Sequence, residues 1–111
     1  MNFNRKDRIA SKVQTLVAEI LRDKFHEDPD ISGVSLVGAE SSGGLNYVKL
    51  FYYTGHGDKK LVARRLADVT RMVRFELAAR MDQKYVPDIR FAYDDTLEKA
   101  QRIDELLAKL N

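Results

Sequence analysis

The sequence contains no cysteine and no tryptophan, and only two histidines and two prolines among its 111 residues. Without cysteine the chain can form no disulfide, thiolate zinc site, iron–sulfur cluster or cysteine nucleophile. Its histidines, His26 and His56, lie thirty positions apart, which leaves little material for a metal centre or a serine–histidine catalytic pair. We therefore expect a protein that is not an enzyme and that holds no metal or other cofactor.

Long apolar runs are missing as well. The longest apolar stretches span a few residues, far fewer than the roughly 20 that a membrane-spanning helix needs, and the Met1 end lacks the apolar core of a signal peptide. The length fits a single domain, residues 1–111, that can bury a modest core without disulfides. These features predict a soluble, monomeric, cytoplasmic protein with no membrane partner.

The net charge of +2 hides an alternation of sign along the chain. Residues 1–24 carry six bases and three acids, and residues 59–87 carry eight bases and three acids. The stretches 25–58 and 88–111 carry an excess of acids. Separated charge of this kind is typical of a surface with a basic face that binds a polyanion. On charge alone, two solvated helix faces explain the pattern equally well.

The first predicted helix carries a cluster of cations at its start. Apolar side chains recur at helical spacing from Ile9 to Phe25, and Asp28 with Pro29 ends the helix, because proline disfavours helical geometry in the residue before it. The helix dipole favours acids at the beginning of a helix, so the basic residues found there do not stabilise it and are candidates for binding. They are Arg5, Lys6, Arg8 and Lys12.

A β-hairpin is predicted by two extended runs on either side of a Ser/Gly turn at residues 41–44. The second strand, Leu45 to Thr54, alternates between two faces, and one face carries the aromatic residues Tyr47, Phe51 and Tyr53. These rings would suit stacking on unpaired bases, yet we expect the last helix to cover them. A protein-interaction adaptor that uses this aromatic face without binding RNA is the alternative function.

A second basic stripe is predicted on a helical segment that runs from Lys59 to about Lys84, either as one long helix or as a broken pair. Four cations share the side opposite its apolar residues: Lys60, Arg64, Arg71 and Arg74. Pro87 then opens a strand that ends at Tyr93. A last helix begins at Asp95 and presents an apolar stripe that we expect to be buried, consisting of Leu97, Ala100, Ile103, Leu107 and Leu110.

This order of elements predicts an α+β fold. A helical crossover between the second and third strands makes those two strands parallel. We therefore expect a three-stranded mixed sheet with the helices packed on one face. The two basic clusters would then neutralise the phosphates of a nucleic acid, which requires cations on one face and nothing more specific.

Several stretches resemble the ribosome-binding factor A family of bacterial small-subunit assembly factors. They are Arg5 and Arg8 with Ile9 to Leu21, Asp28 with Pro29, Val48 to Phe51, Val86 to Phe91 with Tyr93 to Asp95, and Arg102 to Leu107. The resemblance implies a type II KH-like fold, ordered helix-strand-strand-helix-helix-strand with an added C-terminal helix. In that fold a kinked helix pair packs on the sheet, and no catalysis belongs to the family.

The same resemblance implies that the partner is the 30S ribosomal subunit, immature or free, and the precursor of its 16S rRNA. Binding would occur near the decoding region and its 5′ helix, during late maturation and processing of the rRNA 5′ end. Such a factor would hold an immature RNA arrangement, or block entry into translation, until the subunit is ready. Backbone contacts that weaken with salt and recognition of RNA shape would supply the affinity.

The chain departs from the family at the kink. Where the family has an Ala-x-Gly element, this chain has Val69, Thr70 and Arg71. Glycine would let the backbone bend freely and approach a phosphate closely. We expect a helix that bends without glycine, with Thr70 or Asp68 capping its second half, or one that runs nearly straight. In either case Arg71 would reach a phosphate through its side chain.

Overall fold

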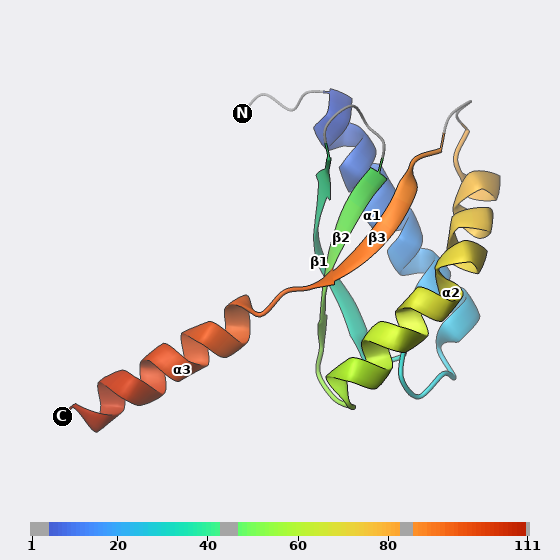
Figure 1. The fold of residues 1–111 in the computed structure, drawn as a ribbon. Coiled ribbons are helices and arrows are strands. Elements are labelled where there is room, and N and C mark those ends of the chain that lie inside the picture. Colours follow the sequence, from blue (N-terminus) through green and yellow to red (C-terminus); the bar gives the residue numbers. More distant parts are fainter. Residues whose placement is uncertain (1–4, 43–46, 83–85, 111) are drawn as a thin grey trace.

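The chain folds into three helices and three strands in a computed structural model that describes residues 5–42, 47–82 and 86–110. The elements are α1 (Arg5–Phe25), β1 (Val34–Ser41), β2 (Tyr47–Thr54), α2 (Lys59–Arg80), β3 (Asp88–Tyr93) and α3 (Thr96–Lys109) (Figure 1). Parts of three predicted features lie outside the described residues: Gly43 and Gly44 of the turn, Leu45 at the start of the second strand, and Lys84 at the end of the second helical segment.

The sheet has the predicted mixed topology. β2 lies in the middle and pairs with β1 antiparallel and with β3 parallel, as a hairpin followed by a helical crossover requires. The register places Leu36 opposite Tyr52, and a shift between Leu36 and Gly38 marks a β-bulge in β1. Both β1 and β3 are edge strands.

One face of the sheet is covered by α1 and α2, which lie side by side in Figure 1. Their predicted apolar stripes are buried as expected and meet alternate residues of β2 in one core. Burial of each large aliphatic side chain stabilises the fold by about 1.5–3 kcal/mol. The centre of this core contains Val13, Val17, Ile20, Val48, Leu50, Val62, Leu66, Val73 and Leu77.

The helical segment after the hairpin is one continuous helix of 22 residues, where the resemblance implied a pair. Asp58 caps it by accepting hydrogen bonds from the backbone N–H groups of Lys60 and Leu61. Near its middle the Thr70 hydroxyl donates to the Leu66 carbonyl, with an oxygen–oxygen distance of 2.7 Å. This arrangement bends helices. Figure 1 shows the axis of α2 changing direction where its colour passes from yellow-green to gold, so the bend needs no glycine.

The expectation that the last helix buries its apolar stripe is wrong. None of the residues described in α3 is buried, and Figure 1 shows the helix leading away from the sheet. The spacing of apolar residues correctly predicts a helix with one apolar side, but spacing cannot show what covers that side. The large apolar residues of α3 and of its C-cap that are more than half exposed are Leu97, Ile103, Leu106, Leu107 and the cap residue Leu110.

A polar contact fixes the start of α3 against the rest of the domain. The Tyr93 hydroxyl donates to Glu98 Oε1 at 2.7 Å, and Lys59 at the beginning of α2 forms an ion pair with the same carboxylate. Lys59 Nζ also lies 5.0 Å from the centroid of the Tyr93 ring. These contacts hold the first turn of α3, while the apolar residues further along it face solvent.

Candidate nucleic-acid interface

The first predicted cation cluster lies at the beginning of α1. All four of its members, Arg5, Lys6, Arg8 and Lys12, are exposed, and within the described ranges none of them has an ion-pair partner. Three of them line a shallow hollow together with Ile9. Asp7 lies among these cations and lines a second hollow with Arg8 and Lys12. Because the cations are exposed, their charge is accessible to an anionic ligand.

The second predicted cluster occupies the outer side of α2. Lys60, Arg64 and Arg71 are exposed there, opposite the buried Val62 and Leu66. No ion pair engages these three cations in the part of the chain that the structure describes. Arg71 follows directly after Thr70, so its side chain leaves α2 at the bend of the helix.

Arg74, the fourth member of this stripe, has structural partners. Its Nε lies 2.7 Å from Asp88 Oδ1, and its Nη2 donates to the Val86 carbonyl at 3.3 Å. These contacts tie α2 to the start of β3 and neutralise part of the Arg74 charge. The other seven predicted cations are therefore stronger candidates for binding a polyanion than Arg74.

An ion-pair network lies where α1 and α2 meet. Arg80 Nη1 lies 3.2 Å from Asp23 Oδ2 and 4.0 Å from Glu19 Oε2, while Lys24 Nζ lies 3.9 Å from Glu76 Oε1. The network involves the last turns of α1 and the last turns of α2, whereas the α1 cluster lies on the first turns of α1 and the α2 stripe on earlier turns of α2. The structure thus places both clusters on helices that cover the same face of the sheet, but no contact within the described ranges joins them.

Arg65 lies on α2 but belongs to the framework of the fold. Its Nε donates to Asp28 Oδ2 at 2.8 Å, and the other oxygen of Asp28 accepts the backbone N–H groups of Asp30 and Ile31. Burial alone would raise the pKa of Asp28. The two backbone donors and the Arg65 guanidinium outweigh that effect and hold the pKa below its ordinary value. Asp28 thereby fixes the loop after α1 to α2.

Sequence reasoning missed two cations on the uncovered face of the sheet. The Arg90 guanidinium carbon lies 3.8 Å from the centroid of the Tyr47 ring, and Lys49 Nζ lies 5.8 Å from the centroid of the Phe51 ring. Alternation along β3 already places Arg90 on the face opposite Ile89. What the sequence lacked was the register of β3 against β2, which sets Arg90 beside Lys49.

The described residues contain neither a cluster of metal-ligand side chains nor a helix suited to spanning a membrane. Among these residues, no three His, Asp or Glu side chains lie together as a possible metal site. None of the described helices combines the length and the apolar character that crossing a membrane would need.

Comparison with known proteins identifies relatives along nearly the whole chain. A family model described as Ribosome-binding factor A matches residues 5–107. The ribosome-binding factor A of Trichlorobacter lovleyi is 34% identical over 113 residues, which cover 99% of this chain and 90% of the relative. That of Lactococcus lactis subsp. cremoris is also 34% identical, over 99% of this chain and 94% of the relative.

A crystal structure and a homology model fitted into a cryo-EM map have the same fold. The crystal structure of ribosome-binding factor A from Thermus thermophilus matches with a TM-score of 0.70 at 17% identity, over 81% of this chain and 97% of that chain. A homology model of the Thermus thermophilus factor, fitted into a cryo-EM map of a 30S–RbfA complex, matches with a TM-score of 0.67 at 17% identity, over 81% and 96% of the two chains. These likenesses confirm the expected KH-like α+β fold.

Proposed function

Because the chain belongs to the ribosome-binding factor A family, we propose that it binds the small ribosomal subunit through exposed cations of α1 and α2. The observation that carries this proposal is the set of seven exposed cations on these helices, none of which belongs to the ion pairs found among the described residues. RNA presents a dense array of phosphates, and each cation that neutralises one releases bound counterions. The 16S rRNA is therefore the component that we expect the protein to contact.

Arg71 is the residue that we expect to contribute most on α2. A guanidinium offers paired donors that match two phosphate oxygens. Arg71 is exposed at the bend of α2, so its fork can reach a phosphate that the backbone of a continuous helix cannot approach. Arg64 lies two turns earlier on the same side and would bind a neighbouring phosphate of the same RNA strand.

We propose further that the bound form is the immature or free 30S subunit, during late assembly and processing of the rRNA 5′ end. The Thermus thermophilus relative whose coordinates were fitted into a map of a 30S–RbfA complex supports this partner. The protein would act without catalysis, by holding an RNA arrangement or by keeping the subunit from translation. Contacts to the sugar–phosphate backbone recognise folded RNA mainly by its shape, which suits a partner that changes shape as it matures.

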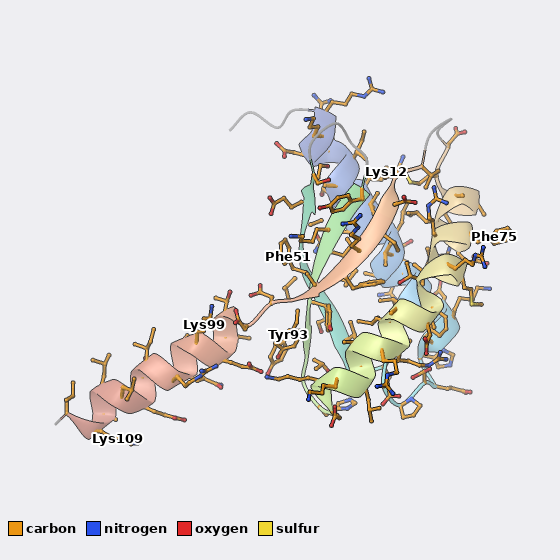
Figure 2. The ribbon with its side chains drawn as sticks, in the orientation of Figure 1. Lys12, Phe51, Phe75, Tyr93, Lys99 and Lys109 are labelled. Atoms are coloured by element: carbon orange, nitrogen blue, oxygen red, sulfur yellow. The ribbon has the colours of Figure 1, made fainter. Side chains whose placement is uncertain are left out.

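The proposal is tested by co-sedimentation with purified small subunits. The wild-type protein should pellet with them, and the double variant Arg64→Gln with Arg71→Gln should bind about tenfold more weakly or worse, because two phosphate contacts are lost. A matched control removes the same charge from α3 through Arg102→Gln and Lys109→Gln. Figure 2 shows Lys109 at the far end of that helix.

The control should bind within about twofold of the wild-type protein, because salt screens the attraction between RNA and charges that lie far from the binding surface. Two results would contradict the proposal. One is a wild-type protein that stays in the supernatant. The other is an α2 double variant that pellets as well as the wild-type protein does.

A further inference from the structure

The face of the sheet opposite α1 and α2 is covered by no described element (Figure 1). β2 places alternate side chains on it, and these are only half-buried. Figure 2 shows Phe51 on this side of the sheet, while Phe75 points outward from α2 on the other side. The side chains on the open face include Tyr47, Lys49, Phe51 and Tyr53 of β2 and Arg90 of β3. The register adds Ser35 and Glu40 of β1, opposite Tyr53 and Lys49, and Asp88 and Ala92 of β3, opposite Tyr47 and Phe51.

Arg90 and Tyr47 form a stacked pair on this face. With 3.8 Å between the guanidinium carbon and the ring centroid, one side of the planar guanidinium lies against the tyrosine. Arg90 is exposed, so the other side of the plane faces solvent. Guanidinium planes and aromatic rings are the two kinds of side chain on which proteins stack unpaired RNA bases. Tyr47 thus holds a flat, charged stacking surface in place.

Phe51 lies between the two smallest residues of the neighbouring strands. The register sets it beside Gly38 of β1 and Ala92 of β3, and a Cβ at Gly38 would lie 3.8 Å from Phe51 Cδ2. Both direct partners of Phe51 are therefore small. Tyr53 follows on the same face at about 6.6 Å along the strand, from the usual rise per residue. Sheets that bind RNA use aromatic residues placed in this way to stack two or three bases.

The open face adjoins the cation cluster of α1. Ser41 at the end of β1 donates its hydroxyl to the Lys6 carbonyl at 3.1 Å, and the Ser42 N–H donates to the Tyr47 carbonyl at 3.0 Å. These bonds bring the first turns of α1 to the end of the sheet that carries Tyr47 and Arg90. Because Ser41 pairs with the buried Val48, this contact lies on the covered side of the sheet. The α1 cluster therefore starts at the same end of the sheet as Tyr47 and Arg90, and an RNA strand would pass around that end to reach it.

We propose that the open face of the sheet binds the unpaired bases of a single-stranded RNA segment whose backbone continues onto the cations at the start of α1. The inference rests on the proposed function, because it says which part of the ribosomal RNA the open face of the sheet binds. Arg90, Phe51 and Tyr53 stack on successive bases, and Lys49 contacts a phosphate between them. The α2 stripe is left to contact folded, double-stranded RNA.

The absence of tryptophan makes this proposal easy to test, because all intrinsic emission comes from tyrosine. The probes are a short oligouridine and a duplex RNA of the same length. Oligouridine should quench the tyrosine emission, since one base stacks on Tyr53 and another on Arg90, which lies against Tyr47. The duplex should not quench it. Phe51→Leu keeps an apolar side chain but removes the stacking face, and it should weaken oligouridine binding about threefold or more.

Two further variants complete the design. Arg90→Gln changes an exposed side chain, so it tests the same surface even if Phe51→Leu unfolds the protein, and it should weaken oligouridine binding to a similar extent. Phe75→Leu is the matched control, because Phe75 is 75% exposed on α2, outside the proposed surface. It should leave oligouridine binding unchanged. Thermal unfolding followed by circular dichroism shows which variants remain folded.

The outcomes separate this inference from the proposed function. Weaker oligouridine binding by Arg90→Gln and by the folded Phe51→Leu protein, with quenching in the wild type, supports it. Oligouridine binding that lacks quenching and survives both changes overturns it, while the proposed function stands if small-subunit binding still depends on Arg64 and Arg71. If the sheet variants bind oligouridine normally but no longer bind a ribosomal protein, the surface binds protein and the inference is wrong. If the wild type binds neither RNA nor subunits, both proposals fail.

Discussion

α1 and α3 are both amphipathic helices, yet one buries its apolar side and the other exposes it. α1 contributes six buried residues to the core, whereas none is buried in the described part of α3. The difference follows from how each helix is connected. The loop after α1 is fixed to α2 through Asp28 and Arg65, which turns the chain back over the sheet. α3 leaves the end of an edge strand, and the contacts of Tyr93 and Lys59 with Glu98 hold it near its first turn.

The comparison shows that amphipathic spacing defines a face, and that tertiary connections decide whether the face is covered. An isolated helix shorter than about 12–15 residues is marginal in water, and α3 has 14 residues. Its stability therefore depends on local contacts such as the ion pair between Lys99 and Asp95. The predictions that follow compare the packed body with this outlying helix.

The largest difference should appear when one leucine is shortened in each region. Leu66 is fully buried on the inner side of α2, so Leu66→Ala should lower the free energy of unfolding by about 2–5 kcal/mol. Leu106 is 61% exposed on α3, and Leu106→Ala should change it by less than about 0.5 kcal/mol. Urea unfolding measures both. A loss above about 1 kcal/mol for Leu106→Ala would mean that α3 packs on something in solution.

The next largest effect should come from the contact that turns the chain after α1. Asp28→Ala leaves two backbone N–H groups and the Arg65 guanidinium without their acceptor, which should cost about 1–3 kcal/mol of unfolding free energy. Asp30→Ala serves as the control, because the Asp30 side chain accepts none of these bonds. Equal stability of the two variants in urea would show that Asp28 does not fix this loop.

Lowering the pH should weaken the contacts of Asp28, because its carboxylate becomes protonated. The folded state lowers the pKa of Asp28 below its ordinary value of 3.8, so the unfolded chain binds the proton more readily. The stabilisation is therefore complete above the ordinary value and is lost as pH falls through the lower folded pKa. The stability of the wild type should fall more steeply below about pH 4 than that of Asp28→Asn. Parallel curves in acid titrations of the two proteins would rule this out.

The smallest effect should come from the start of α3. Tyr93→Phe removes the hydroxyl that donates to Glu98 and should cost about 0.5–1.5 kcal/mol at most. Amide hydrogen exchange is the better measurement, because it reports each helix separately. Exchange in α3 should become faster while exchange in α1 stays the same. Unchanged protection in α3 would show that this hydrogen bond does not hold the helix.

Much of the fold could be predicted from the sequence because its signals are local. The stripe from Val13 to Phe25 and the alternation along β2 each follow from the period of one element. Burial of the α1 stripe was correctly predicted, because that stripe packs in the core. The prediction that the last helix covers the aromatic face of β2 was wrong, because α3 leads away from the sheet. The exposure of Arg64 and Arg71 was also predictable, since they lie opposite the apolar side of α2.

The remaining features depend on contacts between distant parts of the chain. The pairing of Arg74 with Asp88 and of Arg90 with Tyr47 requires the positions of β3 and β2 in space. Thr70 was expected to cap a second half of the helix, but its hydroxyl bonds back to the Leu66 carbonyl within one continuous helix. The position of α3 depends on Tyr93, Glu98 and Lys59, which come from three elements. Spacing along a single sequence carries no signal for such combinations.

The salt dependence of small-subunit binding tests most directly whether the exposed cations bind RNA phosphates. Affinity should fall linearly with salt on logarithmic axes, and each phosphate contact adds about 0.7–0.9 to the slope. The Arg64→Gln, Arg71→Gln double variant should therefore show a slope smaller by about 1.4–1.8, while the α3 control keeps the wild-type slope. Binding by the wild type that does not change with salt, or an identical slope in the α2 double variant, would contradict the account.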